Sequence, residues 1–133
     1  MRFLGRAALA GLVVLFLASI TPAVYGQGKW EYLGSAHVDG AADHDNIKVG
    51  VQDGMFHAIQ LRVKGGAIDF TRVVVHYGNG EPEEVFVRAR IPAGGKTRAI
   101  QLEGHERYLK SVELWYGRGG WATRPEVQLF GMR

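Results

Sequence analysis

The densest group of candidate ligand residues lies between His37 and Asn46, in the sequence HVDGAADHDN. Its three carboxylates, Asp39, Asp43 and Asp45, supply hard oxygen ligands of the kind that Ca²⁺ takes. The imidazole of His44 would instead favour a transition metal. The spacing departs from the calcium-loop pattern D-x-D-x-D-G, and such polar residues also cap backbone amides in solvated turns. The segment is therefore a candidate site for Ca²⁺ or another divalent metal, with a polar turn that needs no cofactor as the alternative.

A second candidate surface lies near the C-terminus, where Trp115, Tyr116 and Trp121 accompany Arg118 and several glycines. Exposed aromatic rings stack on sugar rings, and a glycine-rich loop can shape a shallow saccharide site. Trp115 and Tyr116 are neighbours on a predicted strand, so they point to opposite faces of it. In the alternative, Tyr116 belongs to the core and the two tryptophans cover an edge of a sheet.

A third candidate surface is basic. Arg88 and Arg90 share one face of a predicted strand, and Lys96 and Arg98 follow after a tight turn. In a hairpin these cations would stand side by side, where they can meet phosphate or carboxylate groups. Phe86 on the same face offers a stacking surface. The alternative is a solvated sheet face whose cations are interleaved with acidic residues of a neighbouring strand.

Sequence signatures of catalysis are weak. A zincin-like motif that begins at His105 would need its second histidine where Leu109 stands. No serine of the predicted domain has the G-x-S-x-G setting of a nucleophile elbow. The sequence therefore favours a protein that is not an enzyme. A metal-assisted hydrolase that uses Asp43, His44 and Asp45 is the enzymatic alternative.

The elements that must position these residues are predicted to be strands. From Trp30 onward, about eight apolar segments are separated by turn signals at near-regular spacing, and no segment shows a helical period. The fold class is therefore all-β. We expect one domain, residues 27–133, that forms a single antiparallel β-sandwich, with a barrel- or prism-like closure as the alternative.

The predicted strands are organised around a long hairpin that runs from Ile68 to Ile91 and reverses at a glycine-rich turn. Its first strand changes parity, because the apolar residues up to Phe70 fall on one face and those from Val73 onward on the other. We therefore expect an irregularity near Thr71-Arg72, or a stretch that is buried on both faces. A β-bulge is also expected at Gly34 in the first strand.

Residues 1–26 are predicted to be a secretory signal peptide, cleaved before Gln27 or, alternatively, at Ala23. Arg2 and Arg6 form a positively charged N-terminal region, and the apolar run from Ala7 to Ile20 follows it. This run is shorter than the roughly 20 residues that span a bilayer, although an uncleaved anchor helix is the alternative. Export would place the domain in the periplasm or outside the cell. No later segment is long and apolar enough to cross a membrane.

Charge and cysteine content narrow the choice of partners. The chain has 16 basic and 13 acidic residues and no cysteine. Arg2 and Arg6 belong to the predicted signal peptide, so 14 basic residues remain against all 13 acidic ones. Because nucleic-acid binding relies on a strong positive field, no nucleic-acid partner is expected. The lack of cysteine excludes disulfides, thiolate metal sites and lipid attachment through a cysteine.

Four segments carry a family resemblance: WEYLG, DHDNIKVG, VVVHYGNG and VQLFG. Through them the chain resembles an uncharacterised family of small exported bacterial proteins, a domain of unknown function. The resemblance covers most of the chain after the signal peptide. It implies export and a compact β domain, and it transfers no catalytic or binding residue.

The sequence therefore predicts an exported, non-enzymatic β-sandwich that binds a saccharide or another component of the cell envelope. The alternative is a structural or accessory envelope protein that pairs an edge strand with another protein.

Overall fold

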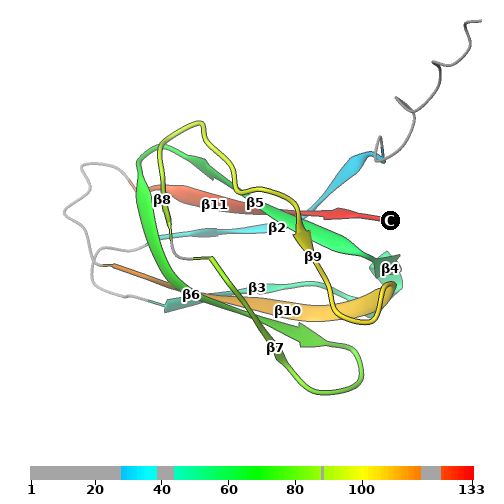
Figure 1. Ribbon diagram of the computed structural model, residues 1–133. Coiled ribbons are helices and arrows are strands. Elements are labelled where there is room, and N and C mark those ends of the chain that lie inside the picture. The colour runs from blue at the N-terminus through cyan, green and yellow to red at the C-terminus, as the bar shows by residue number, and fades with distance from the viewer. Residues whose placement is uncertain (1–27, 39–43, 88, 118–123) are drawn as a thin grey trace, which may run out of the picture.

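The computed structural model describes residues 28–38, 44–87, 89–117 and 124–133 (Figure 1). These residues form β-strands and one short 3₁₀ helix, η3 (Val51–Asp53), and they contain no α-helix. None of the helices in the described ranges is long and apolar enough to cross a membrane. The predicted signal peptide lies outside the described residues.

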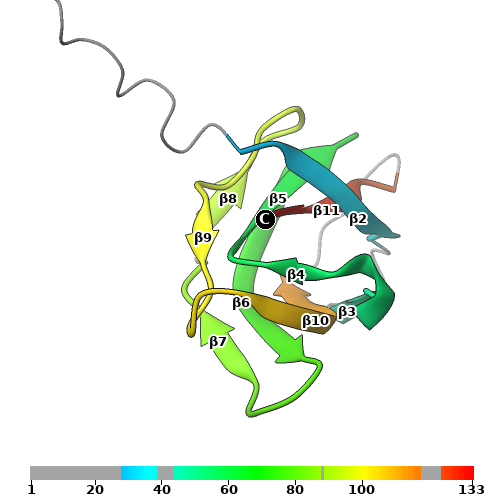
Figure 2. The ribbon, with the colours of Figure 1, turned by 90° about the vertical axis from the view of Figure 1, so that its right-hand side faces the viewer.

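Two antiparallel sheets pack face to face, as the end-on view in Figure 2 shows. The four-stranded sheet has the order β2 (Trp30–His37), β11 (Glu126–Met132), β5 (Ala58–Lys64), β9 (Ile100–Gln101). The main strands of the six-stranded sheet have the order β3 (His44–Lys48), β10 (Arg107–Tyr116), β6 (Ile68–Tyr77), β7 (Glu83–Val85). Two short strands complete this sheet: β4 (Met55–Phe56) pairs with β10, and β8 (Ala89–Ile91) pairs with β6. The predicted all-β sandwich is confirmed, and the sheets do not close into a barrel.

The core between the sheets follows from the alternation of apolar and polar residues. In β5, Leu61 and Val63 are buried while Arg62 between them is half-buried. In β10, Val112 and Leu114 are fully buried while Glu113 points outward. Since successive side chains of a strand point to opposite faces, each strand contributes its in-phase apolar residues to a single core.

A β-bulge in β6 lies where the change of parity predicts an irregularity. Trp115 pairs with Arg72, whereas the next residue, Tyr116, pairs with Phe70. One extra residue of β6 is therefore accommodated, and both Phe70 (2 % exposed) and Val73 (0 % exposed) face the core. Thr71 and Arg72 between them are both exposed. The predicted irregularity is confirmed.

The bulge expected at Gly34 is present as well. Gly34 pairs with Leu129 of β11, and Tyr32 pairs with the next residue, Phe130, so Leu33 is the extra residue of β2. Such an extra residue bends the edge strand locally. This prediction is confirmed.

The returning half of the Ile68–Ile91 hairpin is less regular than predicted. Val85 pairs with Val73, and Ala89 pairs with Phe70, so the returning chain holds one residue more than β6 between these two points. The strand is consequently divided into β7 and β8, and Phe86 lies in the interruption.

The packing of Gly131 generates a stability prediction. A Cβ atom at Gly131 would lie 2.7 Å from Cδ1 of the Phe56 ring and 2.8 Å from Cδ1 of Leu33. Because Phe56 is fully buried, its ring has little room to move. We expect Gly131→Ala to lower the free energy of unfolding by about 1–3 kcal/mol, as overpacked cores do. Urea denaturation measures the change.

Gly117→Ala is the matched control for this prediction. A Cβ atom there would meet only Cβ of Asp69, at an ordinary contact distance of 3.8 Å. If Gly131→Ala were no more destabilising than Gly117→Ala, close packing at Gly131 would be disproved.

Candidate functional site

The outer face of the six-stranded sheet carries a group of polar and aromatic side chains that point away from the core. We call this group the outer-face strip; its members are His44 of β3, Glu113 and Trp115 of β10, Arg72 and His76 of β6, and Glu84 of β7. The register brings them together, because Trp115 pairs with both His44 and Arg72. Four strands from three separate regions of the sequence thus supply one surface.

Glu113 lies between two histidines. Nε2 of His44 is 2.8 Å from Oε2 of Glu113, and Nε2 of His76 is 2.5 Å from Oε1. The hydrogen bonds from His76 and His44 hold the pKa of the Glu113 carboxyl below its ordinary value. The ionised carboxylate is an acceptor only, so each imidazole donates its Nε2–H. Each histidine uses a different oxygen, so the three groups form a hydrogen-bonded chain across the sheet.

Trp115 is stacked between neighbours. The His44 ring lies 4.6 Å from the indole, centroid to centroid, at an interplanar angle of 25°. The guanidinium carbon of Arg72 is 4.7 Å from the centre of the same ring system. Since β3 and β6 flank β10 on opposite sides, the two partners approach the indole from opposite sides. The faces of Trp115 therefore already pack within the protein, which leaves the edge of the indole for a ligand.

The strip ends beside an exposed phenylalanine. Nε of Arg72 donates a hydrogen bond of 3.3 Å to Oε1 of Glu84. A groove of about 330 Å³ follows, lined by Thr71, Arg72, Glu84, Val85, Phe86 and Val87. Phe86 is 78 % exposed, more than any other large apolar side chain in the described part of the chain. It is thus a free aromatic ring next to fixed polar groups.

The residues of the predicted acidic loop do not come together where the structure describes them. His44 points outward to Glu113, whereas Asp45, the next residue of β3, accepts a hydrogen bond of 2.8 Å from the buried Tyr116 hydroxyl. Neighbours on a strand point to opposite faces, so His44 and Asp45 do not face one ion. Asp39 and Asp43 lie outside the described residues. Within the described ranges, no group of three or more His, Asp or Glu side chains is arranged to hold a metal ion.

The other predicted site residues are distributed over the molecule. Tyr116 is buried in the core, as the structural alternative had it. Arg90 is exposed and donates a hydrogen bond of 3.0 Å to Oδ2 of Asp69. Arg88, Arg118 and Trp121 lie outside the described residues. Of the two described members of the predicted aromatic set, Trp115 belongs to the outer-face strip and Tyr116 does not.

Sequence reasoning did not identify four members of the strip, Arg72, His76, Glu84 and Glu113. The available signal was the alternation itself, since each of these polar residues stands out of phase with buried neighbours on its own strand. These residues come together because β3 pairs with β10 and β10 pairs with β6. A local sequence pattern does not reveal which strands pair.

The fold and this face define an all-β sandwich domain whose candidate site is an open polar and aromatic surface. The chain belongs to the family described as Domain of unknown function (DUF2541), whose model matches residues 9–131. The resemblance to a family of unknown function is thereby confirmed. No match is found among curated proteins or among solved structures.

The hydrogen bonds of Glu113 generate a prediction of pH dependence. Because the pKa of Glu113 is lowered in the folded protein from an ordinary value of 4.5, its ionised form stabilises the fold above that value. The contribution is lost as the pH falls through the lowered pKa. We expect Glu113→Gln to be less stable than the wild type at pH 7, and the two stabilities to converge in strong acid. Urea denaturation between pH 3 and pH 7 measures the difference.

Glu81→Gln, which changes an exposed glutamate elsewhere in the chain, controls for the loss of one negative charge. A stability difference for Glu113→Gln that stays constant over this pH range would contradict the role given to Glu113.

Proposed function

We propose that the protein is an exported, non-enzymatic β-sandwich that binds a saccharide or another component of the cell envelope through the outer face of its six-stranded sheet. The single observation that carries the proposal is the exposed ring of Phe86 beside the ion pair of Arg72 and Glu84. Saccharide sites combine an aromatic platform with a few fixed polar groups that orient the ligand.

The chemistry of the strip suits neutral hydroxyl groups. Arg72 and Glu84 neutralise one another, and both carboxylate oxygens of Glu113 already accept hydrogen bonds from His44 and His76. Their remaining donors and acceptors stand in fixed positions, where a hydroxyl can both donate and accept. A ligand that carries a net charge would gain less here than one that offers many hydroxyls.

Binding is tested with polysaccharide pull-downs and a glycan array, using the domain that begins at Gln27. We expect Phe86→Ala to weaken saccharide binding by up to about tenfold, since an aromatic contact contributes about 0.5–1.5 kcal/mol beyond buried area. Glu84→Gln should also weaken binding, because it breaks the ion pair that fixes Arg72.

Tyr108→Ala is the matched control, because Tyr108 is an exposed aromatic residue of the same sheet that lies at the other end, where β10 pairs with β4. Binding that is unaffected by both Phe86→Ala and Glu84→Gln would remove the strip from the function, and so would a complete lack of glycan binding.

Export and a periplasmic or extracellular location are part of the proposal. The basic residues Arg2 and Arg6 and the apolar run after them support it. When the full chain is produced in a bacterium, we expect the mature protein outside the cytoplasm with Gln27, or alternatively Ala23, at its N-terminus. N-terminal sequencing of the fractionated protein measures this; full-length protein in the cytoplasmic fraction would contradict it.

A second candidate function is an accessory role through strand pairing with another envelope protein. Within the described residues, β7 and β8 pair only with β6, so their outer backbone groups are available to a partner strand. Cross-linking in envelope extracts tests this candidate, and recovery of no specific partner counts against it.

A further inference from the structure

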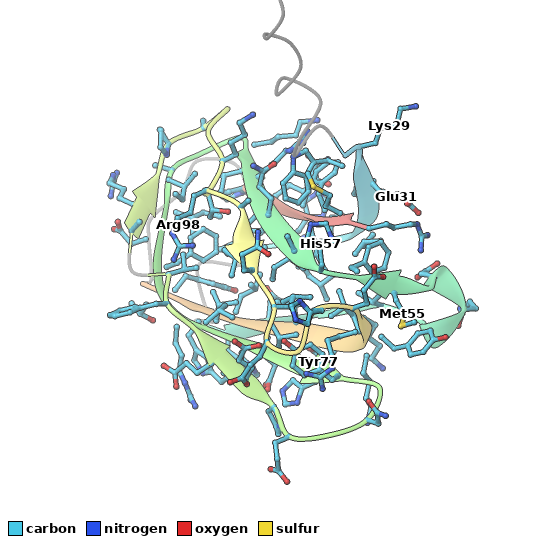
Figure 3. All side chains as sticks on the ribbon, turned by 45° about the vertical axis from the view of Figure 1, so that its right-hand side comes forward. Lys29, Glu31, Met55, His57, Tyr77 and Arg98 are labelled. Atoms are coloured by element: carbon cyan, nitrogen blue, oxygen red, sulfur yellow. The ribbon has the colours of Figure 1, made fainter. Side chains whose placement is uncertain are left out.

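A second groove, also lined by Phe86, lies along the segment that leads from β7 through β8 toward β9. Its volume is about 380 Å³, and it is lined by Phe86, Val87, Ala89, Ile91, Lys96, Thr97 and Arg98. The groove exists because the chain leaves the six-stranded sheet after β8 and crosses to β9 of the other sheet. Figure 3 shows Arg98 on this crossing segment. The two sheets are therefore not joined by strand pairing at this edge.

The floor of the groove is aliphatic. Val87 and Ile91 are 7 % and 8 % exposed, so they belong to the margin of the core. Thr97 is the polar residue of the floor, and its hydroxyl already binds the amide of Leu61 and the carbonyl of Arg98. With Phe86 as a wall, the groove offers apolar surface and few unused hydrogen-bonding groups. An alkyl chain fits this lining better than a sugar does.

The rim of the groove is cationic and has no acidic partner. Arg98 donates to two backbone carbonyls, those of Ala99 and Phe86, each at 3.3 Å. These bonds hold the guanidinium in place but leave its charge uncompensated. Lys96 forms no ion pair with any described residue, and none of the described residues that line the groove is a carboxylate.

Three exposed arginines of the described chain contrast with Arg98, whereas Arg107 also donates only to backbone carbonyls, those of Glu103 and Asn79. Arg72, Arg90 and Arg133 each pair with a carboxylate, of Glu84, Asp69 and Glu31 respectively. An anion that approaches Lys96 and Arg98 would therefore meet two cations without having to displace an internal partner.

We propose that this groove binds a small anionic amphiphile, with its alkyl chain against Phe86, Val87 and Ile91 and its carboxylate or phosphate head against Lys96 and Arg98. The site is distinct from the outer-face strip, whose charges are internally paired. Phe86 lines both this groove and the groove beside Arg72 and Glu84.

Isothermal titration of the domain from Gln27 with dodecanoate and dodecyl phosphate, both below the concentrations at which they form micelles, tests the proposal. Dodecyl maltoside has the same chain with a neutral head, while acetate and inorganic phosphate supply the head alone. We expect both anionic amphiphiles to bind at least tenfold more tightly than any of these three controls. Shortening the chain by two methylenes should weaken binding by about tenfold, as expected for buried methylene groups.

Substitutions locate the site. Lys96→Gln and Arg98→Gln should each weaken binding of the anionic amphiphiles by about tenfold and leave dodecyl maltoside unaffected, and Arg98→Lys should restore part of the affinity. Lys110→Gln, at an exposed lysine of β10, is the control for a general loss of positive charge. Because Arg98 also contacts the backbone, Lys96→Gln is the variant that tests charge alone.

Three results would overturn the proposal: equal affinity for anionic and neutral amphiphiles, unchanged affinity in the Lys96→Gln variant, or binding to phosphatidylglycerol vesicles without binding to the monomeric amphiphiles. Glu84→Gln separates this site from the proposed saccharide site, because it should reduce saccharide binding and leave amphiphile binding unchanged.

Discussion

The pairing of β6 with β10 is the constraint on which the rest of the structure depends. These two strands form the centre of the six-stranded sheet, and both faces of the sheet take their composition from the register between them. The bulge at Thr71 and Arg72 changes the phase of β6, so that its first half and its second half both bury apolar residues. The same change turns Arg72 outward, where it reaches Trp115 and Glu84.

The sequence predicted the parts of this structure that are encoded locally. Alternation predicted the sandwich, the parity change before Val73 predicted the bulge, and Gly34 indicated the irregularity in β2. The partners of Glu113 could not be predicted, because His44 lies 69 residues away and meets it only through the order of the strands. Alternation correctly placed Trp115 and Tyr116 on opposite faces of their strand, but the stacking of Trp115 against His44 depends on the same long-range pairing.

The two proposed sites differ in how their charges are satisfied. On the outer face, cations and carboxylates of adjacent strands compensate one another, as cross-strand pairs of opposite charge commonly do. At the edge groove, Lys96 and Arg98 have no carboxylate partner among the described residues, and the cross-strand neighbour of Lys96 is another cation, Arg62 of β5. A neutral ligand suits the first surface and an anionic ligand suits the second.

The interruption of the returning strand has a further consequence for association with other chains. A long, flat, unpaired edge strand is a template for aggregation, and many β proteins shorten or kink such edges. Here the edge is divided into β7 and β8, each only three residues long, with Phe86 between them. A strand that adds to this edge can pair with only three residues of β7 or of β8 in one unbroken ladder, which leaves room for a short partner strand but disfavours uncontrolled stacking of copies. The break that opens the groove thereby also protects the sheet from self-association.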